Sequence, residues 1–204
     1  MLSRAFSKIW ILVILIILVG GGILFWQYFL MVEEVEAPGT ETPEAPEEKE
    51  ETARLTLESL ENAEYYFALY DKRVRLINGL HGEEEITDED GYTYIFSAGM
   101  VKDRVAFGDL NNDGREDVAV IIYSTGGGSG LFYELAAVID ENGSPCHLTS
   151  KYLGDRIRVN SVAIRDSIIT LEMIIHDLGD AFCCPTLHKV SQYKLFENEL
   201  LELE

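Results

Sequence analysis

An apolar run near the start of the chain limits which residues can build a water-soluble core. No charged side chain occurs from Ile9 to Val32, where Ile, Leu, Val, Phe and Trp dominate. Because a helix crosses a hydrocarbon core of roughly 30 Å with about 20 apolar residues, we predict a single transmembrane helix over residues 9–32. A cleaved signal peptide is the alternative, and it fits less well because its apolar region usually has about 7 to 15 residues.

The charges on either side of this run predict its orientation. Basic residues precede it and acidic residues follow it, namely Arg4, Lys8, Glu33, Glu34 and Glu36. Since basic flanks stay on the cytoplasmic side, we expect residues 1–8 in the cytoplasm and everything beyond residue 32 outside it. The sequence therefore predicts a single-pass protein of the cell membrane with an extracytoplasmic C-terminal domain.

Residues 33–51 have the composition of a disordered tether. They carry nine Glu and one Lys, a net charge of −8, and three of the chain's five prolines. Like charges repel one another, proline resists helix formation, and the apolar content is too low to offset the entropy of ordering. We expect this acidic linker to hold the following domain away from the membrane.

Residues 52–204 are long enough to form one domain with a sizeable core. The whole chain has a net charge of −20; the linker accounts for −8 and the first eight residues for +2, which leaves −14 for the domain. A surface of this sign repels nucleic acid and anionic lipid, so we expect no nucleic-acid partner. An envelope component or another protein is the expected partner.

Short β-like segments separated by turn residues make up most of this domain. The runs 118–123 and 131–139 are almost continuously apolar, which is typical of central strands buried on both faces. Turn residues recur at intervals of about 8 to 12 positions, which favours an antiparallel meander. We expect a helix at 57–63, capped by Thr56, and an acidic loop at 83–91. Strands are expected at 65–69, 74–77, 92–96, 104–107, 118–123, 131–139, 147–153, 156–164, 168–175, 186–196 and 200–203. The predicted fold is mainly β, a sandwich or barrel-like sheet with one short helix, preceded by the transmembrane helix.

The segment DLNNDGRED, residues 109–117, has the spacing of a calcium loop. Loop positions 1, 3, 5 and 9 carry oxygen-bearing side chains, which are Asp109, Asn111, Asp113 and Asp117. Ca²⁺ takes six to eight oxygen ligands at about 2.3 to 2.6 Å, so these side chains must converge while the chain turns sharply. Gly114, at position 6, suits such a turn because glycine tolerates positive φ.

The residues around this loop argue against an EF-hand. An EF-hand needs flanking helices and a bidentate Glu at position 12, but position 12 is Val120 and both flanks are β-like. The segment instead resembles the strand-loop-strand calcium hairpins of FG-GAP repeats in integrin-type β-propellers. That resemblance implies that the backbone carbonyl of Arg115 supplies position 7. A propeller is not expected, because the motif occurs once. The alternative is an Asx-rich hairpin turn whose side chains only cap their own backbone.

A series of short motifs extends across most of the domain. They are Phe107–Asn111 with Asp113-Gly114, Gly127–Gly130, Leu153–Arg156 and Cys183–Thr186. In this order and spacing they resemble the LppP/LprE lipoprotein family and related bacterial envelope proteins, from about Leu57 to the C-terminus. The resemblance implies an exported bacterial domain of unknown biochemical role. The chain departs from the lipoprotein pattern because a transmembrane helix replaces the lipid-modified cysteine.

The three cysteines all fall on the exported side, where disulfides persist. Cys183 and Cys184 are neighbours, with Cα atoms about 3.8 Å apart, which is below the usual minimum of about 4.4 Å for a disulfide. We therefore expect Cys146 to pair with one of them and the other thiol to be left over. An alternative treats the loop from His176 to Cys184 as a transition-metal or redox site, although its spacing is not that of a CxxC pair or a zinc ribbon.

No catalytic constellation emerges from the sequence. His81, His147 and His188 are scattered, and each is expected to be a surface or hydrogen-bonded residue and not a base. The glycine-rich run 126–130 precedes no helix, so we expect a hairpin loop and not a phosphate cradle. We predict a non-enzymatic, membrane-anchored module, structured by Ca²⁺, that binds an envelope component or another protein. The alternative is an envelope hydrolase that uses paired carboxylates in a pocket or the loop from His176 to Cys184.

Overall fold

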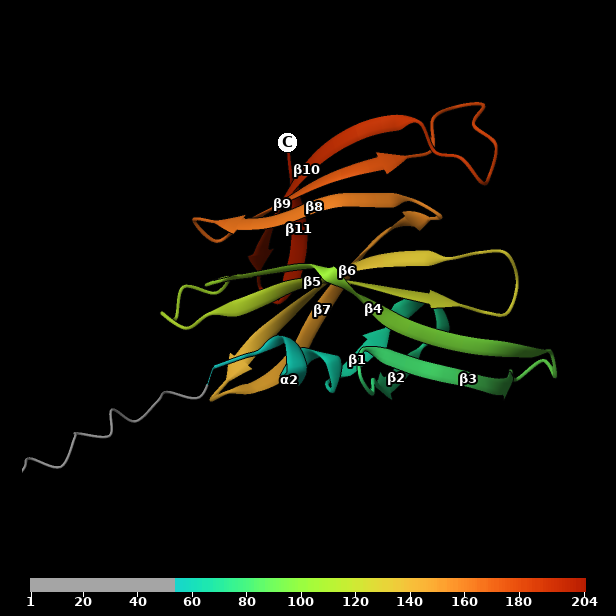
Figure 1. Cartoon of the computed structure of the whole chain (residues 1–204), viewed down its shortest axis with the longest axis horizontal. Coiled ribbons are helices and arrows are strands. Elements are labelled where there is room, and N and C mark those ends of the chain that lie inside the picture. The colour runs from blue at the N-terminus through green and yellow to red at the C-terminus, as the bar shows by residue number, and fades with distance from the viewer. Residues whose placement is uncertain (1–53) are drawn as a thin grey trace, which may run out of the picture. The chain divides into compact units, whose positions relative to one another are not determined.

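Residues 54–204, the part of the chain that the structure describes, form three antiparallel β-sheets and one short α-helix in a computed structural model (Figure 1). The elements are α2 (Leu57–Glu61), β1 (Glu64–Phe67), the 3-10 helix η1 (Ala68–Tyr70), β2 (Lys72–Arg75), β3 (Leu80–Thr87), β4 (Thr93–Gly108), β5 (Asp117–Thr125), β6 (Phe132–Glu141), β7 (Ser144–Asp155), β8 (Arg158–Arg165), β9 (Ile168–Ile175), β10 (Leu187–Phe196) and β11 (Glu199–Leu203). The predicted mainly β, antiparallel class with one short helix is confirmed.

The predicted segments 1–8, 9–32 and 33–51 lie outside the described residues. Within residues 54–204, no helix has the length and apolar character needed to cross a membrane. The description that follows therefore concerns the C-terminal part of the chain.

A five-stranded sheet with the order β3-β4-β5-β6-β7 lies at the centre of this part. Each strand pairs with the next in sequence, as a meander requires. Successive side chains of β5 enter two different cores: Val120 faces one, whereas Ala119 and Ile121 face the other. Because side chains alternate between the two faces of a strand, this continuous apolar run is buried on both sides, as predicted.

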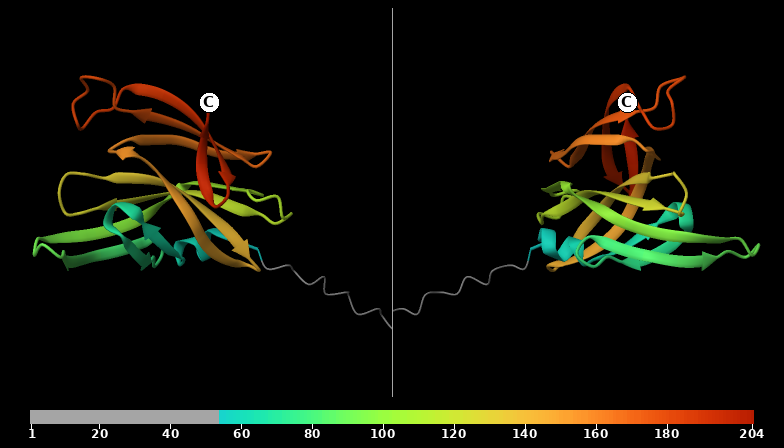
Figure 2. Two further views of the ribbon diagram at one scale, coloured as in Figure 1. Left: turned by 180° about the vertical axis from the view of Figure 1, so that it is seen from behind. Right: turned by 45° about the vertical axis from the view of Figure 1, so that its right-hand side comes forward.

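The four-stranded sheet, with the order β11-β10-β9-β8, covers one face of the central sheet. Ile169 and Leu171 of β9 share a core with Ile121 of β5 and Leu135 of β6. Figure 2 shows the two sheets packed face to face from two further directions. Burial of these aliphatic side chains between two sheets is the main attraction between them.

The other face of the central sheet is covered by α2 and the two-stranded sheet β1-β2. Tyr65 and Phe67 of β1 are fully buried there. Thr56 caps α2 as predicted, since its hydroxyl accepts the Ser59 N–H at 3.1 Å and the Ser59 hydroxyl accepts the Thr56 N–H at 3.0 Å. This reciprocal pair satisfies two N–H groups that the first helical turn leaves without partners.

The acidic loop predicted at residues 83–91 is wrong for most of its length. β3 continues to Thr87 and pairs with β4 along the edge of the sheet. Edge strands commonly carry charged side chains, which discourage pairing with another chain, so three consecutive glutamates are compatible with a strand here. The turn is confined to residues 88–91, where Asp88 Oδ1 accepts the N–H groups of Asp90 and Tyr92.

The strands predicted at 92–96 and 104–107 are parts of one long strand, β4, which ends at the candidate calcium loop. Its pairing with β5 shifts register between Met100 and Val105. A bulge of this kind bends a strand without ending it. Lys102 and Asp103 lie in this bulge, between the two strands that the sequence predicted.

Candidate metal-binding loop

The DLNNDGRED segment connects β4 to β5 as a hairpin loop, and Asp117 is the first residue of β5. Gly108 pairs with Asp117 across the base of the hairpin. Gly114 has φ +87°, so the sharp turn expected at loop position 6 is present. The loop therefore has the strand-loop-strand setting predicted for it.

Asp117 lies at the base of the loop and is completely buried. Its Oδ2 accepts the N–H of Leu110 and its Oδ1 accepts the N–H of Asp140, both at 3.0 Å. Burial raises the pKa of this carboxyl, and the backbone N–H groups oppose that rise without cancelling it. Asp117 is thus a buried acid whose charge the surrounding protein compensates only in part.

The carboxylates of Asp109 and Asp113 accept hydrogen bonds from the backbone of the loop itself. Asp109 accepts the N–H of Asn112 at 2.7 Å and that of Gly114 at 2.9 Å. Asp113 Oδ1 accepts the N–H of Arg115 at 2.8 Å. Hydrogen bonds from the Asn111 amide and from this N–H lower the pKa of Asp113, so it is an exposed, ionised carboxylate.

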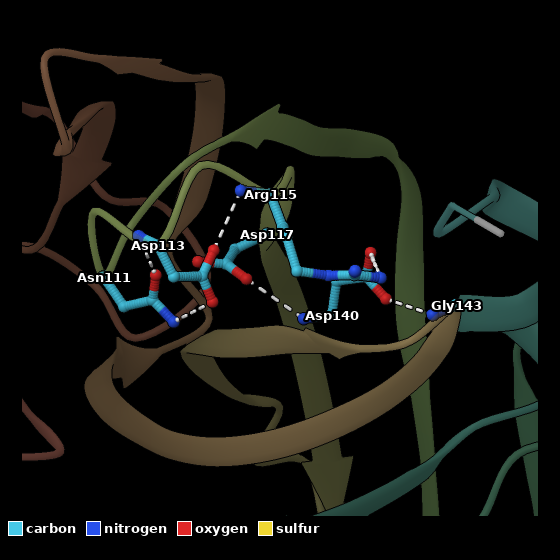
Figure 3. Close-up of polar contacts among 6 residues, drawn as sticks. All are labelled: Asn111, Asp113, Arg115, Asp117, Asp140 and Gly143. Carbon is cyan, nitrogen blue, oxygen red and sulfur yellow. Dashed lines mark hydrogen bonds and ion pairs between the residues drawn. The ribbon is translucent and has the colours of Figure 1, made fainter. Parts of the chain in front are cut away.

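Among the predicted ligands, Asn111 has the side-chain orientation that is least suited to binding a cation. Its Oδ1 accepts the N–H of Asp113, and its Nδ2 donates to Asp113 Oδ2, both at 2.9 Å (Figure 3). A metal ion requires oxygen in place of that amide N–H. Within residues 54–204, no group of three or more His, Cys, Asp or Glu side chains is arranged so that it could hold a metal ion.

Two residues that the sequence did not single out fasten the loop to the rest of the fold. Asp140, at the end of β6, accepts a hydrogen bond from Arg115 Nη2 at 2.9 Å and one from the Gly143 N–H (Figure 3). Ser167, in the β8–β9 turn, donates through its hydroxyl to the Asp109 carbonyl at 2.7 Å and contacts Asn112 Oδ1 at 2.9 Å. The loop is therefore held by both large sheets.

The cysteine pairing expected from the sequence is wrong. Cys183 and Cys184 are joined to each other, and Cys146 is a free thiol in β7. The loop of residues 176–186 packs beside Asp155, whereas Cys146 lies near the opposite end of β7. Nine residues of strand span about 30 Å, so the predicted partners are far beyond the reach of a disulfide. The thiolates that a transition-metal site would need are consumed by the bond between the neighbours.

The hydrolase alternative predicted paired carboxylates with perturbed pKa values in a pocket. A pocket of about 470 Å³ is indeed lined by Asp155, Asp177, Asp180 and His176. Burial alone would raise the pKa of Asp155, but its ion pair with Arg156 and the Leu131 N–H outweigh that effect and lower it. The pKa of Asp180 is lowered mainly by the Asp177 N–H. A general acid needs a raised pKa, so neither Asp155 nor Asp180 has the pKa shift that the role of general acid requires.

Two buried titratable groups bind the backbone of the β1–η1 segment. His147 accepts the Tyr66 N–H at 2.9 Å and contacts the Ser150 hydroxyl at 2.9 Å, and burial lowers its pKa to about 4. It is the hydrogen-bonded histidine that the sequence led us to expect. Glu134 is 2% exposed, interacts with the Ala68 N–H, and has its pKa raised to about 7 by burial. In the sequence Glu134 was only an interruption in an apolar run, so no signal marked it as buried.

No match was found when the chain was compared with protein-family models, with curated proteins and with solved structures. The likeness to FG-GAP loops and to the LppP/LprE family is therefore carried by the sequence motifs alone. The contacts of the loop itself are the basis for proposing a function.

Proposed function

We propose that residues 52–204 are an extracytoplasmic module that binds Ca²⁺ in the loop 109–117 and is held at the membrane by residues 9–32. The observation that carries the proposal is the complete burial of Asp117 at the base of the loop. A buried carboxylate costs free energy unless it is paired or coordinates a metal. Its pKa is raised despite hydrogen bonds from backbone N–H groups, so a neighbouring cation would favour its ionised form.

The donor set of the loop suits a hard cation. The proposed ligands are side-chain oxygens of Asp109, Asn111, Asp113 and Asp117 and the backbone carbonyl of Arg115. Each carboxylate offers about four lone-pair sites, so the backbone N–H groups bound by Asp109 and Asp113 leave acceptor capacity for an ion. Ca²⁺ tolerates such irregular oxygen cages, with water completing the shell, better than Mg²⁺ does.

Binding requires the carboxylates of Asp109 and Asp113 to move toward Asp117, because in the described structure the three do not form a group that could hold a metal ion. The Asn111 amide must turn so that its oxygen replaces its nitrogen beside Asp113. The buried anchors, Asp117 and Asp140, keep their backbone contacts during this change. The ion therefore closes a loop that is already in a turned conformation, which limits the ordering cost of binding.

The wider role that we propose is non-enzymatic binding of an envelope component or a protein, with calcium as a structural element. Extracellular calcium modules bind the ion at about 10⁻⁴ to 10⁻³ M, so external calcium would keep such a site filled. The net charge of −14 on the domain favours a partner with basic groups. The resemblance of the sequence motifs to those of the LppP/LprE family supports an exported bacterial setting.

Calcium-dependent stability of the full-length chain in detergent tests the proposal. We expect Ca²⁺ to raise the melting temperature measured by circular dichroism, and an ion at one hundred times its Kd contributes about 2.7 kcal/mol. Asp113→Ala should abolish the shift without unfolding the chain, because Asp113 is exposed. Asp90→Ala, in the turn after β3, is the matched control and should keep the shift. An unchanged melting temperature of the wild type in calcium, or an equal shift in Asp113→Ala, would contradict the proposal.

A further inference from the structure

The disulfide between Cys183 and Cys184 lies in the exposed loop that connects β9 to β10. Both cysteines are exposed, so their sulfur atoms are open to attack by a thiolate in solution. Phe182, immediately before them, is 77% exposed. Access, the first requirement for thiol–disulfide exchange, is therefore met.

This disulfide does little to stabilise the fold. The entropic benefit of a crosslink grows with the number of residues in the loop that it closes, and neighbouring residues close the shortest possible loop. The bond also joins no two strands or sheets, since both cysteines belong to one connection. Its presence is not explained by a structural contribution to the two large sheets.

Hydrogen bonds and a cation–π contact hold the loop in place on either side of the cysteine pair. Asp180 Oδ2 accepts the N–H groups of Asp177 at 2.8 Å and of Thr186 at 2.9 Å, and the Thr186 hydroxyl donates to Asp180 Oδ1 at 2.9 Å. The guanidinium of Arg156 lies 5.2 Å from the centre of the Phe182 ring. These contacts do not depend on the disulfide, so they would hold the two sulfur atoms at the surface after reduction.

The remaining cysteine is unsuited to exchange with this pair. Cys146 lies on β7 near the opposite end from the 176–186 loop and is only half-exposed. Burial and the nearby Glu141 carboxylate raise its pKa, which keeps the thiol protonated and unreactive. Electrons for the Cys183–Cys184 bond would therefore come from outside the domain.

We propose that Cys183–Cys184 is a reversible redox site that takes two electrons from an external dithiol while the fold stays intact. A thiolate of the dithiol attacks one sulfur, forms a mixed disulfide and releases the thiolate of the neighbouring cysteine, which takes up a proton. The second thiol of the dithiol then breaks the mixed disulfide. The dithiol is oxidised to its cyclic disulfide, and Cys183 and Cys184 are reduced to two thiols.

The test uses the full-length chain with Cys146→Ser, so that Cys183 and Cys184 are the only cysteines left. The native protein is treated with dithiothreitol, then alkylated with iodoacetamide and analysed by peptide mass spectrometry and circular dichroism. We expect no label before reduction, two labels on residues 183 and 184 after it, and an unchanged β spectrum. After the dithiothreitol is removed, oxidised glutathione in excess should restore the closed pair and remove the labelling.

A second variant tests the proposed mixed disulfide. In Cys146→Ser/Cys183→Ser, the single remaining thiol should form a stable adduct with a monothiol disulfide such as oxidised glutathione, because no neighbour is present to resolve it. The proposal is overturned if residues 183 and 184 are labelled before reduction, if they become reducible only in denaturant, or if the β spectrum is lost when they are reduced.

Discussion

His147 links β7 to the backbone of β1 through a neutral imidazole. Burial lowers its pKa from 6.5 to about 4, with a smaller contribution from the charge of Arg73. The unfolded chain therefore binds a proton near pH 6.5 that the folded chain rejects until about pH 4. The stability that this histidine contributes is present above pH 6.5 and is lost as the pH falls toward 4.

The first prediction concerns this histidine. Relative to His147→Gln, the wild type should lose about 3 kcal/mol of unfolding free energy between pH 6.5 and pH 4, because one pKa unit corresponds to about 1.4 kcal/mol. Urea unfolding followed by circular dichroism at intermediate pH values measures the difference. His188→Gln, an exposed histidine on β10, is the control and should follow the wild type. Parallel curves for wild type and His147→Gln would show that the imidazole titrates normally.

Glu134 has the opposite pH dependence. Burial raises its pKa from 4.5 to about 7, so the folded chain holds a proton that the unfolded chain releases. Its contribution to stability is fully present below pH 4.5 and is lost as the pH rises through 7. Between pH 4.5 and 6.5 the slopes of Glu134 and His147 oppose each other, so the contributions of these two groups to the stability of the wild type largely cancel across this window.

The second prediction follows from this opposition. Glu134→Gln keeps the shape of the side chain but removes its titration, so from pH 6.5 to 4.5 the variant should lose about 2 kcal/mol more unfolding free energy than the wild type loses. The same urea experiments measure both curves. Glu172→Gln, an exposed glutamate on β9, serves as the control. A variant profile that runs parallel to that of the wild type would rule out the raised pKa of Glu134.

At the scale of elements, the candidate loop depends on a contact with the β6–β7 hairpin. Asp140 is 5% exposed; its carboxylate binds Arg115 of the loop and the Gly143 N–H of the hairpin turn. Removing one partner from a buried charged pair leaves the other without compensation. The hairpin thus positions the residue whose carbonyl is the proposed ligand at loop position 7.

The third prediction tests this coupling. Asp140→Asn should lower the unfolding free energy by about 2 kcal/mol and weaken calcium binding by about 10-fold, as expected for a residue that orients a metal ligand. Unfolding in chelator and calorimetric titration in calcium measure the two effects separately. Asp103→Asn, which alters an exposed ion pair with Arg104, should change neither. A destabilised variant with unchanged calcium affinity would confine Asp140 to a structural role.

The elements that the sequence predicted well are those whose signals are local. Thr56 caps α2, the apolar run of β5 is central, and Gly114 takes the positive φ that the loop requires. Each of these follows from the residue itself or from its immediate neighbours. By contrast, the glutamates of β3 were taken for a loop because edge position, which makes charge acceptable in a strand, depends on the sheet.

The contacts that the sequence did not reveal join distant segments. Ser167 reaches the candidate loop across 58 positions, and Glu134 meets η1 only because β6 and the β1–η1 segment border the same core. The disulfide was mispredicted for a related reason. The short Cα–Cα distance between neighbouring cysteines disfavoured a Cys183–Cys184 bond and left Cys146 as the expected partner, but the length of β7 separates Cys146 from the 176–186 loop. Distances along the sequence did not indicate these distances in space.

At the scale of the whole domain, the candidate loop is a junction between the two large sheets. It belongs to the five-stranded sheet through β4 and β5, and it accepts the Ser167 hydroxyl from the β8–β9 turn of the four-stranded sheet. The Asp140 contact ties it to the β6–β7 hairpin as well. An ion that orders this loop should therefore reduce opening motions in both sheets.

The last prediction measures that coupling by amide hydrogen exchange of the full-length chain. Calcium should slow exchange in the loop 109–117, in the turn 140–143 and in the turn 166–168, with the β10–β11 turn at residues 197–198 as the internal reference. Because the Ser167 hydroxyl carries the link to β8–β9, Ser167→Ala should abolish the effect at 166–168 and keep it at 109–117. Slower exchange at 109–117 alone in the wild type would mean that the ion orders only its own loop and leaves the two sheets uncoupled.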